Sequence, residues 1–254
     1  MDISRVLNIA TYAGKIILEN GGEIYRVEET IIRICNAYNI KIVEPFATPT
    51  AIIVSASSEY GQNISIIKRI KKRSLNLEKI SQVNDISRNI KNKGFTLEYI
   101  ESELHKVENS KSYSIKVNIL FSGITAAFFA LVFGGNLRDF FVSFIIGCLI
   151  KSTSTLLGFL QTNDFFVNTL CGALAALVAL LSVHLGIGAH ADKIIIGSIM
   201  LLVPGLAITN AIRDTIAGDL IAGISRGVEA FLIAIAIAVG TGATMKIWFL
   251  LLEG

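Results

Sequence analysis

The sequence DKIIIGSIMLLVPGLAITNAIRDTIAGDLIAGISRGVEAF, residues 192–231, decides how the chain is organised. It begins as an apolar helical segment, is interrupted by Pro204 and Gly205, and becomes apolar again after Glu229. Proline removes a hydrogen bond within a helix and clashes with the preceding turn, so we expect the helix to kink or open here. At membrane depth the freed backbone groups must be satisfied by protein or by a water-filled cavity.

Polar residues directly follow this break. A broken helix followed by ionisable residues is a common construction of substrate sites in membrane transporters. The alternative is a kinked structural helix joined to a polar interfacial loop. The residues in question are Thr209, Asn210, Arg213, Asp214 and Asp219.

Composition divides the chain into a polar and an apolar part. The 254 residues are 52% hydrophobic, with a mean hydropathy of +0.62, which is too apolar for an ordinary globular domain. Residues 1–116 hold 17 of the 23 Lys and Arg and 13 of the 20 Asp and Glu. We therefore expect an α+β domain over 1–116 and an all-α membrane domain over 117–254. The three cysteines form no pairable framework, so we expect no disulfide.

The polar part carries clear signals for helices and strands. Helical periodicity alternates with a segment rich in β-branched residues, KIVEPFATPTAIIVSAS at 41–57, and glycines mark the helix ends. The expected elements are helices over Ile3–Ile17, ended by Asn20-Gly21-Gly22, and over Val27–Tyr38; two strands within 41–57; a turn at Glu59–Gln62; a third strand near 63–70; and helices from Ile80 to Gly94 and after the cap Thr96.

A basic run and a carboxylate cluster in the polar part both have simple explanations. The run KRIKKR, Lys68–Arg73, has no interleaved aromatic residues and no recognised motif, which favours a solvated face or anionic lipid over nucleic acid. Glu23, Glu28 and Glu29 stand at the start of a helix, where carboxylates complement the helix dipole. No nucleophile motif, metal-spaced His/Cys set or phosphate-binding glycine loop accompanies them. We expect no enzyme, no catalytic residue, no metal and no cofactor.

After residue 116 we predict about five membrane-spanning helices, because five segments are long and apolar enough to cross a bilayer. The polar domain should remain cytoplasmic in a cell-membrane protein, which places the C-terminus outside. The predicted spans are 117–135, 140–160, 165–186, 193–211 and 227–250.

Lys151 is a costly residue near the centre of the second predicted span. A lysine at mid-bilayer costs about 3 kcal/mol even on the insertion scale that penalises it least. Ser154 and Thr155 share its helix face, so we expect Lys151 to face a cavity or a carboxylate partner. The alternative is a shifted span that leaves Lys151 near an interface.

Three segments together resemble the threonine/serine exporter family. They are ENGGEIYRVEETIIRICNAYNI, ATPTAIIVSAS and PGLAITNAIRDTIAGDLIAGISRGVEA, of which the last is the most specific. The proportions of the chain are similar to those of the long subunit of the family's split form. The resemblance implies a cytoplasmic domain, a multispanning permease, and export of small hydroxy amino acids or of dicarboxylates such as succinate. It further implies coupling to the proton gradient or membrane potential.

Physical reasoning gives roles to the residues beside the break. The carboxylate of an amino acid needs a cation, for which Arg213 and Lys151 are candidates, while Thr209 and Asn210 can recognise a hydroxyl. A carboxylate desolvated in a cavity can have a raised pKa and carry a proton. The candidates for this coupling role are Asp214, Asp219 and Glu229.

We also expect this chain to work with a partner. Small residues at Gly172, Ala175, Ala179, Ser182 and Gly186 form a stripe that suits close packing by another helix. The resemblance implies that the partner is a short hydrophobic membrane subunit, and a homo-oligomer is the alternative. Two other functions stay open at this point: a membrane-anchored sensor or regulator, and a membrane-bound hydrolase that uses the polar domain.

Overall fold

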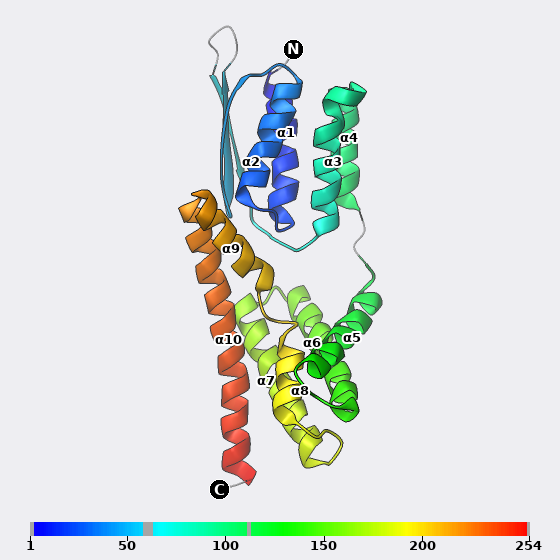
Figure 1. The fold of residues 1–254 in the computed structure, drawn as a ribbon. Coiled ribbons are helices and arrows are strands. Elements are labelled where there is room, and N and C mark those ends of the chain that lie inside the picture. The colour runs from blue at the N-terminus through cyan, green and yellow to red at the C-terminus, as the bar shows by residue number, and fades with distance from the viewer. Residues whose placement is uncertain (1–2, 58–62, 111–112, 253–254) are drawn as a thin grey trace. The chain divides into compact units, whose positions relative to one another are not determined.

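The computed structural model describes residues 3–57, 63–110 and 113–252, and these form two compact units (Figure 1). The first unit contains the elements up to helix α4 and the segment Leu206–Val228. The second contains helices α5 to α8 and the part of α10 from Glu229 onward. The first unit is α+β and the second is helical in its described residues, and most of the described chain is helix.

Two helices form the centre of the first unit. Helix α1, Ile3–Glu19, and helix α2, Ile24–Ala37, are joined by a turn in which Gly21 has a φ of +90°. This conformation is accessible to glycine without steric cost. The apolar face of each helix is fully buried, as the spacing of Val6, Ile17 and their neighbours predicts.

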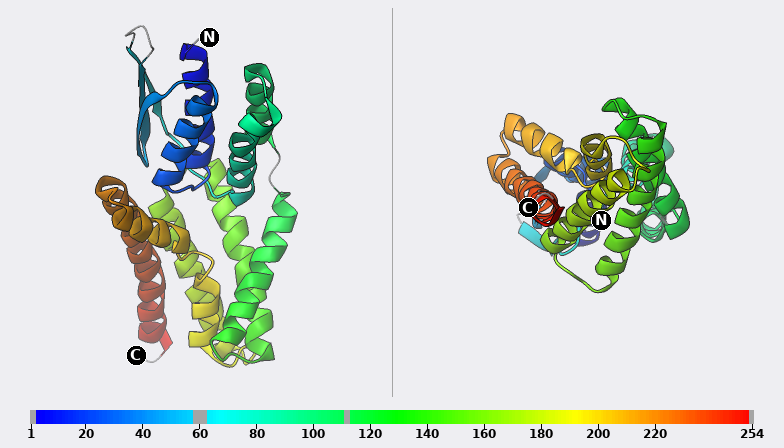
Figure 2. Two further views of the ribbon diagram at one scale, coloured as in Figure 1. Left: turned by 45° about the horizontal axis from the view of Figure 1, so that its top comes forward. Right: turned by 90° about the horizontal axis from the view of Figure 1, so that it is seen from below.

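A three-stranded sheet packs on these helices. Strands β1 (Ile42–Thr48), β2 (Ala51–Ser57) and β3 (Asn63–Arg69) pair antiparallel in the order β1-β2-β3. The alternate residues Ile52 and Val54 of β2 face α1 and α2, which cover one side of the sheet in Figures 1 and 2. The three predicted strands are confirmed, whereas the predicted turn at 59–62 lies outside the described residues.

Helices α3 (Leu77–Lys93) and α4 (Leu97–Asn109) pack on the side of α1 and α2 away from the sheet (Figure 2). The side chain of Thr96 accepts a hydrogen bond from Tyr99 N, which confirms the predicted cap. Gly94 ends α3 with a φ of +61°, as a glycine after a helix predicts.

The second unit is a bundle of long apolar helices. They are α5 (Ile115–Val132), α6 (Leu137–Phe159), α7 (Asp164–His184) and the later part of α10 (Leu220–Leu252), with the short α8 (Ala191–Ile199) packed between them. The carboxylate of Asp139, fully buried at the start of α6, accepts hydrogen bonds from Ala189 N and His190 N. These bonds tie the start of α6 to the loop before α8.

Four helices of the described chain, not five, are continuous and apolar enough to cross a membrane: α5, α6, α7 and α10. The predicted span 193–211 is not one helix. Helix α8 ends at Ile199, and the next helix, α9 (Gly205–Ala217), begins only after Pro204. The nine residues of α8 rise about 13 Å, less than half of the ~30 Å hydrocarbon core. The opening expected at Pro204 is therefore a complete interruption.

The part of the small-residue stripe that lies on α7 is buried and offers no free surface, which corrects the expectation that a partner helix packs there; Gly186, beyond the end of α7, is exposed. Ala175 and Ala179 are fully buried within the chain. A Cβ on Gly172 would lie 3.0 Å from the carbonyl oxygen of Ile237, so α10 already occupies this approach.

Candidate functional site

Helix α9 packs against the turn between α1 and α2. The amide of Asn210 donates a hydrogen bond of 2.9 Å to Gly21 O, and the backbone N–H of Ile24 donates one of 3.2 Å to the Asp214 carboxylate. Ile24 is the first residue of α2, where N–H groups have no partner within the helix. A side chain about 190 residues further along the chain thus accepts a hydrogen bond from the first N–H group of α2.

Asp214, which takes part in this contact, also forms a buried ion pair with Arg226. Asp214 is fully buried and Arg226, from the first turns of α10, is 6% exposed. Nε of Arg226 lies 3.4 Å from Oδ2 of Asp214, and Nη2 donates a hydrogen bond of 2.7 Å to Gly22 O. Burial raises the pKa of the Asp214 carboxyl above its usual value, and the charge of Arg226 offsets only part of this rise.

Two glycines in this region leave no space for a side chain. A Cβ on Gly223 of α10 would lie 2.9 Å from the carbonyl oxygen of Ala211 and 3.0 Å from Thr215 N, both on α9. A Cβ on Gly22 would lie 3.0 Å from the carbonyl oxygen of Ile17. Backbone atoms cannot move aside as a flexible side chain does, so both positions require glycine.

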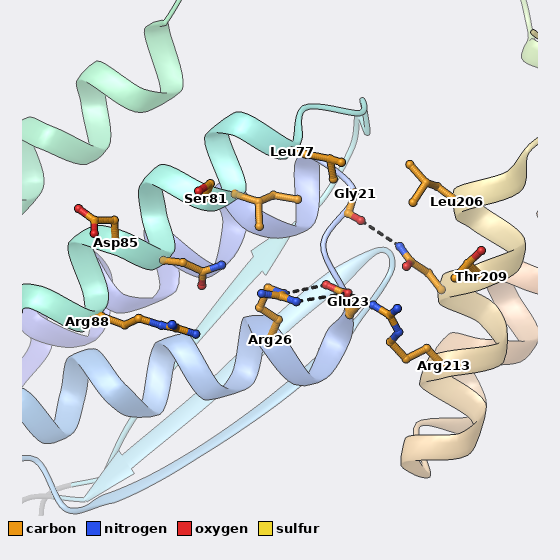
Figure 3. A pocket seen from close by; sticks show the side chains of 13 residues that line it. Gly21, Glu23, Arg26, Leu77, Ser81, Asp85, Arg88, Leu206, Thr209 and Arg213 are labelled. Atoms are coloured by element: carbon orange, nitrogen blue, oxygen red, sulfur yellow. Dashed lines mark hydrogen bonds and ion pairs between the residues drawn. The ribbon is translucent and has the colours of Figure 1, made fainter.

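Beside this junction, within the first unit, α2, α3 and α9 enclose an open cleft of about 550 Å³ (Figure 3). Its walls carry three arginines, two carboxylates, a serine, a threonine and two asparagines, with apolar side chains at one end. The lining residues are Gly21, Glu23, Arg26, Leu77, Ile80, Ser81, Asn84, Asp85, Arg88, Leu206, Thr209, Asn210 and Arg213.

Glu23 holds two of the arginines in place. Arg26 binds it through Nε at 2.8 Å and Nη2 at 3.4 Å, and Arg213 of α9 pairs with the same carboxylate. Burial by itself raises the pKa of Glu23, but the hydrogen bond and charge of Arg26, a backbone hydrogen bond and the hydrogen bond from Arg213 together outweigh burial and lower it. Glu23 therefore stays ionised and keeps both guanidinium groups at the cleft.

The third arginine of the cleft, Arg88, is exposed on α3. Within residues 3–57, 63–110 and 113–252, no carboxylate forms an ion pair with it. Three arginines against Glu23 and Asp85 leave the cleft with a formal charge of +1. The same described residues contain no group of three or more His, Cys, Asp and Glu placed to hold a metal ion.

Comparison with known proteins shows what kind of protein this is. The profile of the threonine/serine exporter family matches residues 8–248, nearly the whole chain. The chain belongs to the threonine/serine exporter family. This family consists of membrane transporters, and the four apolar helices agree with a multi-pass membrane protein.

Individual relatives of this exporter-family chain are distant. It is 24% identical over 252 residues to a threonine/serine exporter of Corynebacterium glutamicum, covering 96% of this chain but only 52% of that protein. It is 22% and 23% identical to proteins named "Probable succinate transporter subunit" of Klebsiella aerogenes and Escherichia coli, covering 90% and 94% of their lengths. No solved structure matches this chain.

In this member of the exporter family, the residues predicted around the break fall into separate places. Thr209, Asn210 and Arg213 line the cleft, and Pro204 and Gly205 directly precede and begin α9. Asp214 lies on the buried side of α9. Asp219 lies close enough to Glu28 to contribute, after burial, to a raised pKa of that carboxyl.

The other predicted residues belong to the second unit. Lys151, Ser154 and Thr155 lie half-buried on α6, and Glu229 begins the part of α10 that belongs to this unit. The hydroxyl of Thr155 donates to the carbonyl of Lys151 one turn earlier. Among the described residues, no carboxylate pairs with Lys151, and the expectation that it faces a cavity or a carboxylate partner stays a prediction.

Sequence reasoning missed the part of the site that comes from the polar domain. The position of Glu23 at the start of a helix is typical of a carboxylate that complements the helix dipole, and the sequence pattern assigns no role to Arg26. Arg88 carries no signal of its own, whereas Arg226 lies in the segment that resembles the exporter family most specifically. The available clue was the double glycine, because two adjacent glycines in a helical hairpin also indicate close approach by another segment.

Proposed function

We propose that this chain is a subunit of a secondary transporter that exports small hydroxy amino acids such as threonine and serine, or dicarboxylates such as succinate. The membrane potential or the proton gradient would drive export. The observation that carries the proposal is the arginine-lined cleft in a chain of the exporter family, because carboxylates are common to all of these substrates and guanidinium groups bind them well. The names of the relatives support both substrate classes.

The proposal includes a fifth membrane crossing made by a broken helix. Three continuous helices, α5 to α7, follow the first unit, so the end of α7 lies on the opposite side of the membrane from that unit. The first turns of α10 belong to the first unit again. The segment between them, residues 185–205 with α8 and the opening at Pro204, would then cross back. The first unit is cytoplasmic and the C-terminus is outside.

Roles follow for the residues near the opening. Arg213, Thr209 and Asn210 meet the substrate at the cleft, and Lys151 with Ser154 and Thr155 lines the path through the membrane domain. Asp214, Asp219 and Glu229 are the candidates for carrying the coupling proton. The raised pKa that burial gives Asp214 supports its place among them.

A second protein completes the transporter in this proposal. The relatives of similar length are named as transporter subunits, whereas the Corynebacterium relative is about twice as long as the part matched here. The proposed partner is a short hydrophobic membrane subunit, and a homo-oligomer is the alternative assembly.

The experiment is flux from proteoliposomes that contain this chain alone or with the candidate subunit. We expect efflux of labelled serine, threonine or succinate that depends on an imposed potential or pH gradient and requires both proteins. Arg213→Gln should reduce flux, and Lys246→Gln, an exposed lysine near the end of α10, is the matched control. Binding without any flux in either preparation would favour a sensor and contradict export.

A further inference from the structure

We propose that the cleft between α2, α3 and α9 binds a small amino acid, with Arg88 contacting its carboxylate and Asp85 its ammonium group. The choice of ligand rests on the proposed function, but binding itself does not require transport. The volume of about 550 Å³ is in the range of small-molecule sites. Its walls come from three elements that are distant in sequence.

The positive formal charge of the cleft favours a ligand with an anionic group. Glu23 already engages Arg26 and Arg213, whereas no described carboxylate pairs with Arg88. A guanidinium group with a free fork binds a carboxylate through two parallel hydrogen bonds. Figure 3 shows Arg88, Arg26, Glu23 and Arg213 following one another across the cleft from α3 to α9. A carboxylate bound to the Arg88 guanidinium would therefore lie on the side of Arg88 that faces Arg26.

The spacing of residues on α3 distinguishes between classes of carboxylate. Asp85 stands three residues before Arg88 and therefore beside it on the helix surface. The carboxylate and ammonium groups of an amino acid are attached to the same carbon. Arg88 can bind the first group, and Asp85, whose side chain points away from Arg88 in Figure 3, binds the second after turning toward it. Ser81, one turn earlier, and Asn84 can hydrogen-bond a side-chain hydroxyl. Succinate has no cation for Asp85, so we expect it to bind more weakly than serine or threonine.

Equilibrium binding to the purified full chain in detergent tests the assignment. The ligands are L-serine, L-threonine, succinate and L-serinamide, which keeps the ammonium group but has no free carboxylate. We expect serine and threonine to bind, succinate to bind more weakly, and serinamide not to bind. Arg88→Gln should weaken serine binding by about 10-fold or more, because it removes charge-assisted hydrogen bonds. Lys91→Gln, the same charge change on an exposed part of α3, should leave it unchanged.

Asp85→Asn separates the two halves of the proposed head-group site. It should weaken serine binding and leave succinate binding unchanged or stronger, because the removed charge repels a dianion. Equal effects on serine and succinate would contradict the role of Asp85. Unchanged serine binding in Arg88→Gln would overturn the proposed site.

Cysteine protection locates the ligand independently of these variants. Ser81→Cys places a thiol in the cleft, and Ser102→Cys places one on the exposed surface of α4. Serine should slow maleimide labelling at position 81 and not at position 102, with the unmodified chain as background. Equal labelling with and without serine would place the ligand elsewhere. Serine binding and protection without flux would contradict export alone, whereas flux with no protection would contradict the cleft alone.

Discussion

At the scale of residues, the pair Asp214–Arg226 should control the stability of the first unit. Arg226→Met leaves the Asp214 carboxylate buried without its cation, which costs about 3–5 kcal/mol of unfolding free energy. Adding Asp214→Asn removes the buried charge and keeps an acceptor for Ile24 N, so the double variant should recover most of the loss. Unfolding of the purified chain, followed at pH 8, measures both changes.

The pH dependence of this effect has a definite sign. The pKa of Asp214 is raised in the folded protein, so the folded state holds this proton more tightly than the unfolded state. Its contribution to stability is present at low pH and is lost as pH rises through the raised pKa. The defect of Arg226→Met should therefore shrink as pH falls from 8 toward 5, and the double variant should lack this dependence. A defect that is equal at both pH values would contradict the buried ion pair.

At the scale of elements, α9 and α10 depend on one glycine. Gly223→Ala should separate the two helices, because its Cβ would meet backbone atoms of Ala211 and Thr215. We expect a destabilisation of about 1–3 kcal/mol, typical of overpacking. Gly242→Ala on the same helix is the control: a Cβ there meets nothing within 4 Å, so the change should be neutral or stabilising, as alanine in a helix is. Melting temperatures of the two variants in detergent decide the question, and equal values would contradict the close packing.

The individual elements could be predicted from sequence because their signals are local. Thr96 caps α4 through its own neighbours, and Gly94 ends α3 through its own backbone conformation. The interruption at Pro204 is local as well. The position at which α9 packs is not set by local signals, because its contacts with Gly21 and Ile24 join segments about 190 residues apart. The same limit applies to the cleft. The break at Pro204 predicts its α9 residues, but only the tertiary structure shows that Arg88 of α3 lines the same cleft.

At the scale of the whole molecule, the proposed five crossings can be tested by cysteine accessibility in intact cells. Ile187→Cys, in the exposed loop after α7, and a cysteine appended after the C-terminus should react with an impermeant maleimide. Thr162→Cys, between α6 and α7, and Ser102→Cys in the first unit should resist it until the cells are opened. A protected C-terminus together with a reactive Ile187→Cys would contradict the crossing by the broken helix.

The contact between α9 and the α1–α2 turn has a consequence for how the protein is made. The ribosome releases residues 21–24 long before Asn210 and Asp214 exist. At about 5–20 residues per second, a separation of 190 residues amounts to roughly 10–40 s. During that time the turn and the start of α2 lack the groups that later satisfy them, while α5, α6 and α7 are being inserted. The N-terminal unit can therefore be complete only after the membrane helices α5, α6 and α7 have been synthesised. A chain truncated before α9 lacks these contacts and exposes the α1–α2 turn to the cell's chaperones and proteases.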